Sequence, residues 1–136
     1  PHVEKKIPQI LSVAEVELLL EQPSGNTPKE LRDKAMLELL YATGIRVSEL
    51  ISLKVQDVNL HMNYICCHDG EKERVIPFER VAKEAILRYL QLGRDSLNKE
   101  SEYLFVNYQG GVMTRQGFWK IIKHYANMAG IEKDIT

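Results

Sequence analysis

The chain is poor in cysteine: its 136 residues include only Cys66 and Cys67, which are adjacent. Neighbouring residues of a strand point to opposite faces, and a disulfide between them would be strained. This excludes a disulfide framework. We expect both thiols to be reduced, as in a cytoplasmic protein.

The chain also lacks a long hydrophobic run, since none reaches the roughly 18 residues that a membrane-spanning helix needs. Its first residues, 1–6, carry proline and mixed charges with no hydrophobic region behind them, so we expect no signal peptide and no membrane partner. We interpret residues 1–8 as the end of an interdomain linker. With 44% hydrophobic residues overall, residues 9–136 can form one domain with a single core.

An excess of positive charge is missing as well. The formal net charge is −1, whereas a domain that binds nucleic acid is usually basic. The charge is unevenly distributed, because residues 112–125 contain Arg115, Lys120 and Lys123 and no acid. One basic face on a neutral domain can still bind DNA, with strong salt dependence.

What is present predicts a mainly α domain with a small antiparallel β-sheet (α+β). Ser12, Thr27 and Thr114 are suited to cap helix starts, and glycines follow the helical patterns. Helices are predicted over about 13–22, 28–43, 47–53, 79–92 and 115–129. Strands are predicted over 58–60, 64–68 and 74–77, with a hairpin turn at Asp69-Gly70 and a short buried strand or turn at 103–106.

Arg46 is the most informative residue of the chain. It follows Gly44, which suits the left-handed conformation that closes a helix, and it stands where the next helix begins. The free N–H groups of that helix and the guanidinium would converge on one place, which suits a phosphate. The alternative is that Arg46 is solvated or pairs with Glu49 three residues later.

Residues 31–50, which include Thr43-Gly44-Ile45-Arg46, closely resemble the catalytic domain of tyrosine site-specific recombinases of the Xer/integrase type. Further blocks match in register at 53–58, 72–77, 104–107 and 114–120. The resemblance covers nearly the whole chain. It implies the catalytic-domain fold of DNA breaking-rejoining enzymes, with duplex DNA and other recombinase protomers as partners.

The resemblance also implies a chemistry. In this family a tyrosine hydroxyl attacks a scissile DNA phosphate, and a strand end then attacks the 3′-phosphotyrosine, with no metal or other cofactor. Two arginines clamp the transition state, and a lysine on a hairpin donates a proton to the leaving oxygen. Arg46 matches the first arginine, and its planar, permanently charged fork suits that task.

The hairpin lysine matches less well. Family hairpins commonly read Gly-Lys-Gly-x-Lys-Glu-Arg, whereas residues 68–74 read His-Asp-Gly-Glu-Lys-Glu-Arg and are one residue shorter. Asp69 or Gly70 takes the lysine's place, and Lys72 is the lysine that remains. We take Lys72 as the candidate catalytic lysine and Arg74 as a DNA contact. The alternative is that both are strand-surface residues that touch the DNA backbone or water.

The last predicted helix, which begins after Thr114, resembles the family helix that contacts the recognition sequence. Arginine suits guanine and glutamine suits adenine in the major groove, so Arg115 and Gln116 are candidates for base contacts. Lys120 and Lys123 would contact phosphates. The alternative is a plain amphipathic helix with an inward face of Phe118, Ile122, Tyr125 and Met128; both can hold on different faces.

We predict no metal site. Among the clustered histidines and cysteines, His61, Cys66, Cys67 and His68, only Cys66 and His68 share a strand face, and no paired-cysteine spacing is present.

The end of the chain predicts a truncated catalytic domain. After this position the family carries a Pro-His-x-Leu-Arg-His block, with a catalytic histidine and the second arginine, and later the tyrosine nucleophile. None of these follows residues 131–136, and the six tyrosines lie on apolar stripes, on strands or in a loop. We expect the chain alone to be inactive. A non-catalytic DNA-binding module and a protein-interaction domain are the alternatives.

Overall fold

The computed structural model describes residues 11–131, so the expected linker (1–8) and the end of the chain lie outside the described residues. The described elements are α1 (Val13–Glu21), α2 (Pro28–Thr43), α3 (Val47–Ser52), the 3-10 helix η1 (Val55–Asp57), β1 (Val58–Asn59), β2 (Tyr64–Asp69), β3 (Lys72–Pro77), α4 (Arg80–Leu92), α5 (Arg94–Asn98) and α6 (Arg115–Met128). This confirms a mainly helical domain with a small antiparallel sheet. The sequence analysis missed η1 and α5, and residues 103–106 make two isolated bridges rather than a strand.

The helix boundaries follow from local capping. The hydroxyl oxygens of Ser12, Thr27 and Thr114 each accept the N–H of the residue three positions later, at 3.1, 3.2 and 2.9 Å. Gly44 closes α2 with a φ of +68°, and its N–H donates to the Leu40 carbonyl at 2.9 Å. That left-handed backbone strains any residue with a Cβ, which explains glycine two positions before Arg46.

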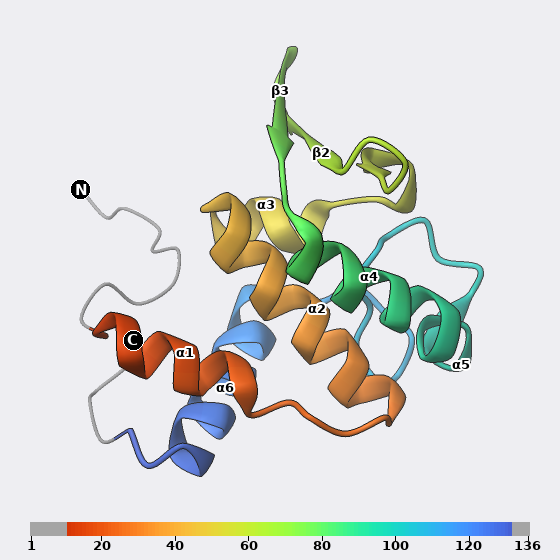
Figure 1. Cartoon of the computed structure of the whole chain (residues 1–136). Helices are drawn as coiled ribbons and strands as arrows, with labels where there is room; N and C mark the ends of the chain where they lie inside the picture. The colour runs from red at the N-terminus through yellow and green to blue at the C-terminus, as the bar shows by residue number, and fades with distance from the viewer. Residues whose placement is uncertain (1–10, 132–136) are drawn as a thin grey trace.

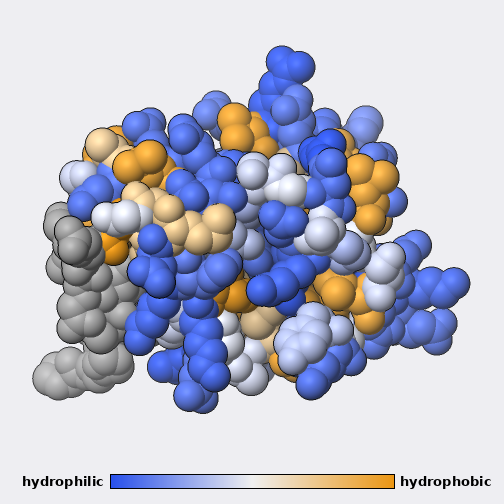
Figure 2. Space-filling model, turned by 90° about the horizontal axis from the view of Figure 1, so that it is seen from below, coloured by the Kyte–Doolittle hydropathy of each residue, from blue (hydrophilic) through white to orange (hydrophobic). Residues whose placement is uncertain are grey.

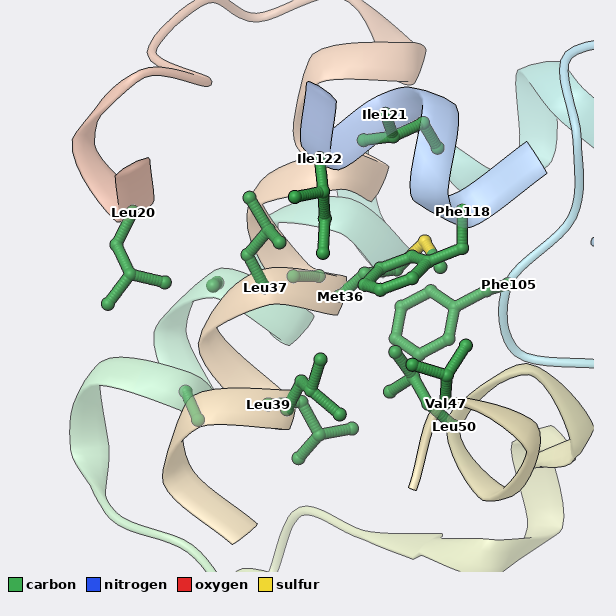
Figure 3. Packing of buried hydrophobic residues seen from close by; sticks show 14 of the residues in the cluster. Leu20, Met36, Leu37, Leu39, Val47, Leu50, Phe105, Phe118, Ile121 and Ile122 are labelled. Atoms are coloured by element: carbon green, nitrogen blue, oxygen red, sulfur yellow. The ribbon is translucent and has the colours of Figure 1, made fainter. Parts of the chain in front are cut away.

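The core surrounds α2. This helix lies beside α4 and also contacts α1, α3 and α5 (Figure 1). In Figure 3, Met36 and Leu37 of α2 face Phe118 and Ile122 of α6, and all four are fully buried. Each such side chain contributes about 1.5–3 kcal/mol through burial. Met128 was wrongly predicted to face inward: it is the last residue of α6 and is 56% exposed.

A buried polar network fixes α6 to α2. The Asp33 carboxylate is fully buried, and its Oδ1 accepts from Nε and Nη2 of Arg32 at 3.0 and 2.7 Å. Its Oδ2 accepts the Tyr125 hydroxyl at 2.6 Å. Arg32 also donates to the Val106 carbonyl at 3.1 Å. Because a buried charge is costly without partners, these contacts specify how α2, α6 and the segment before α6 lie together.

The sheet is antiparallel, with strand order β1-β2-β3, and the β2–β3 hairpin projects beyond the helices (Figure 1). Its turn is Gly70-Glu71, with Asp69 opposite Lys72. Gly70 has a φ of +63°, as a glycine at the first central position of a hairpin turn requires. The predicted hairpin is therefore confirmed, with its turn displaced by one residue.

The helical end of the molecule, seen from below in Figure 2, is mainly hydrophilic, and its apolar residues form separate small patches. Within residues 11–131, no helix combines the length and apolar character needed to cross a bilayer.

Candidate functional site

A pocket of about 480 Å³ lies between the start of α3 and the β2–β3 hairpin. The residues that line it come from the end of α2, from α3, from η1 and from both hairpin strands: Gly44, Arg46, Ser48, Glu49, Ser52, Leu53, Asp57, Cys66, Cys67, His68 and Arg74. The hairpin therefore lies across the pocket from the start of α3, where Arg46 is located. This brings together two segments that the sequence analysis had singled out separately.

Glu49 organises the two arginines of the pocket. Its Oε1 accepts the backbone N–H of Arg46 at 2.9 Å, which caps α3, and its Oε2 pairs with Nη1 of Arg74 at 3.1 Å. Glu49 therefore binds the main chain of Arg46, and its ion pair is made with Arg74. Among the side chains that the structure describes, no carboxylate forms an ion pair with the exposed Arg46 guanidinium.

The second acid of the pocket, Asp57, also has partners. Its side chain is 8% exposed, and its Oδ2 accepts the N–H of Lys54 at 2.9 Å. Its Oδ1 lies 3.0 Å from Nε2 of His68. Both pocket carboxylates are thus engaged, and the positive charge of Arg46 remains available to an anion. Because α3 has only six residues, its dipole adds little and the guanidinium is the main attraction.

The two cysteines are free thiols, in agreement with expectation. Cys67 is buried, and burial followed by the nearby Glu49 charge raises the pKa of its thiol to about 11. Burial and the neighbouring Glu73 raise the pKa of the Cys66 thiol. Both are therefore neutral at neutral pH, and neither is an activated nucleophile.

Lys72 lies at the start of β3, opposite Asp69, and its side chain is exposed. It is not among the residues that line the pocket, so its catalytic role stays a prediction. Two residues that the sequence analysis did not assign to this pocket, Asp57 and His68, do line it. His68 directly precedes the predicted turn, a position that could have drawn attention to it.

Helix α6 has the two faces that the sequence predicted. Phe118, Ile122 and Tyr125 are buried. The four candidate DNA contacts on this helix all lie on the exposed side: Arg115, Gln116, Lys120 and Lys123. Helix α6 also contacts α3, whose first turn borders the pocket. The DNA contacts of the four exposed side chains on α6 stay predictions.

A model of the phage integrase family matches residues 9–136. The chain belongs to this family. Tyrosine recombinase XerD of Halalkalibacterium halodurans is 48% identical over 139 residues, which cover 100% of this chain and 46% of the relative. XerD of Oceanobacillus iheyensis is 51% identical over 140 residues, which cover 100% and 47%. The chain thus spans just under half the length of these integrase-family relatives.

Solved structures agree with this family assignment. The XerA recombinase superposes with a TM-score of 0.82 at 31% identity, over 96% of this chain and 46% of that one. The XerH site-specific recombinase, solved with its difH substrate before cleavage, gives a TM-score of 0.78 at 23% identity, over 96% and 39%. The mainly helical fold with its small sheet is therefore that of the integrase-family catalytic domain.

Proposed function

We propose that the complete protein carries out site-specific DNA recombination through a 3′-phosphotyrosine, and that this chain binds duplex DNA and supplies part of the active site. The proposal rests on the pocket, in which Glu49 pairs with Arg74 and no described carboxylate pairs with the Arg46 guanidinium. The family and the XerD relatives support the same activity.

Arg46 is assigned to the non-bridging oxygens of the scissile phosphate. A guanidinium offers two parallel N–H donors to two oxygens, and its charge strengthens both bonds as the transition state gains negative charge. Arg74, oriented by Glu49, contacts the neighbouring DNA backbone. These groups need no metal or cofactor, because the covalent link to tyrosine conserves the phosphodiester energy.

Lys72 is assigned as the proton donor to the leaving oxygen. It lies on the hairpin that forms one wall of the pocket, and its long side chain is exposed. It must turn toward the pocket when DNA binds, which the flexible lysine stem allows. The tyrosine nucleophile and the second arginine would come from the part of the relatives' length that this chain does not span.

Helix α6 is assigned to the major groove. Arg115 and Gln116 lie in its first turn, where side chains can reach base edges, and Lys120 and Lys123 follow along its exposed side. Recombination also needs other protomers of the recombinase as partners. We place this activity in the cytoplasm, where reduced thiols such as Cys66 and Cys67 persist.

The experiment is a fluorescence-anisotropy titration of the 136-residue chain, starting at low salt, with duplexes that differ at single base pairs. Arg115→Ala should cost about 1–3 kcal/mol and relax preference at one base position. Lys120→Ala and Lys123→Ala should weaken binding to all duplexes and each reduce the salt slope by about one.

Two results would count against this assignment. Absence of DNA binding at low salt would favour the protein-interaction alternative. Equal effects of Arg115→Ala and Lys120→Ala on every duplex would mean that α6 does not read bases.

A further inference from the structure

Three side chains with metal-binding atoms meet on the outer part of the hairpin. Cys66 and His68 are two residues apart on β2 and share a face, and Glu73 of β3 lies directly opposite His68. Their ligand atoms all lie within 4.8 Å of one another. Cys66 Sγ is 3.7 Å from Glu73 Oε2, and His68 Nδ1 is 3.7 Å from Glu73 Oε1. The sequence analysis missed this cluster because Glu73 comes from the partner strand.

These separations suit a tetrahedral metal ion. With zinc bonds of about 2.0–2.3 Å, two ligand atoms of a tetrahedral site lie about 3.3–3.8 Å apart. One carboxylate oxygen of Glu73 lies at that distance from Cys66 Sγ and the other lies at that distance from His68 Nδ1, so small side-chain rotations would bring three ligand atoms around one ion. The fourth position would be left to water.

A metal-bound histidine usually donates a hydrogen bond from its other ring nitrogen, and Asp57 supplies the acceptor for His68. Its Oδ1 lies 3.0 Å from Nε2 of His68, and the Lys54 N–H holds its other oxygen at 2.9 Å. Asp57 is buried and so provides a fixed acceptor. It favours the proton on Nε2 and leaves the Nδ1 lone pair for the side on which Glu73 lies.

We propose that Cys66, His68 and Glu73 form a binding site for Zn²⁺, with Asp57 orienting the histidine. The mixed sulfur, nitrogen and oxygen set favours zinc over magnesium or calcium, which prefer oxygen alone. The ion ties β2 to β3 near the hairpin tip. Since Cys66 and His68 also line the pocket, it lies at the pocket's edge. The proposal does not depend on recombinase activity.

The test is a Zn²⁺ titration of the 136-residue chain against a chromophoric chelator, with circular dichroism to confirm folding. We expect one ion per chain. Glu73→Gln changes a residue whose side chain is 63% exposed, so the fold should survive and the affinity should fall at least tenfold. Cys66→Ser and His68→Ala should do the same, and Asp57→Asn should weaken binding by about 10- to 100-fold.

The matched controls are Cys67→Ala, which removes the adjacent thiol, and His61→Ala, which removes an exposed histidine outside the cluster. Both should keep wild-type affinity. Substituting Co²⁺ should give a thiolate-to-cobalt charge-transfer band that Cys66→Ser abolishes and Cys67→Ala keeps. Three results would each overturn the site: no binding at one equivalent, unchanged affinity in Glu73→Gln, or a band that depends on Cys67.

Discussion

Replacing Glu49 should destabilise the fold, whereas replacing Arg46 should not. Glu49→Ala removes the hydrogen bond to the Arg46 N–H at 2.9 Å and the ion pair with Arg74 at 3.1 Å. The cap contributes about 0.5–1.5 kcal/mol. The ion pair joins side chains that are 16% and 50% exposed, and such a solvent-screened pair contributes about 0.2–1 kcal/mol. Glu49→Ala should therefore lower the free energy of unfolding by about 1–2 kcal/mol.

Arg46→Ala leaves the backbone N–H of residue 46 in place and removes an exposed guanidinium. It should change the free energy of unfolding by less than about 0.5 kcal/mol. Urea denaturation followed by far-ultraviolet circular dichroism measures both variants, and an unchanged m-value shows that the denatured state is comparable. Arg74→Ala removes the ion pair and leaves the Glu49 cap in place, so it should lower the free energy of unfolding by less than Glu49→Ala, about 0.2–1 kcal/mol.

A loss of stability in Arg46→Ala as large as that in Glu49→Ala would contradict this prediction. The guanidinium of Arg46 would then stabilise the fold and would not be available to bind a phosphate.

Two further predictions concern the missing nucleophile and the buried network. The 136-residue chain should form no covalent adduct with a nicked suicide duplex, because none of its tyrosines matches the family nucleophile; an adduct mapped to any of its six tyrosines would contradict this. Tyr125→Phe should lower the free energy of unfolding by about 1–3 kcal/mol, because it leaves the buried Asp33 Oδ2 without its donor. Tyr41→Phe, at a side chain 48% exposed, is the control and should be near neutral; equal effects would rule out a special role for the network.

Local signals explain why much of the fold could be predicted from the sequence. A capping hydroxyl acts within three residues, so the starts of α1, α2 and α6 follow directly from Ser12, Thr27 and Thr114. Gly44 likewise marks the end of α2, because its left-handed backbone conformation is a local requirement that glycine meets without strain. The exposed and buried faces of α6 follow from helical spacing.

Features that depend on contacts distant in sequence could not be predicted. Tyr125 and Asp33 are 92 residues apart, and no local pattern pairs them. Helix α5 directly follows Gly93, and no helix was predicted there. The pairing of His68 with Glu73 depends on hairpin register: a turn at Asp69-Gly70 would place Glu71 opposite His68, whereas the observed turn at Gly70-Glu71 places Glu73 there.

The central claim is that Arg46 binds the scissile phosphate, and single-turnover strand cleavage by the complete recombinase tests it most directly. Arg46→Ala should reduce the cleavage rate by about 100-fold or more. DNA affinity and thermal stability should change little. Arg46→Lys should restore the rate only in part, since an ammonium lacks the two-pronged donor geometry. Wild-type cleavage by Arg46→Ala, or a loss of cleavage that DNA affinity alone explains, would contradict the account.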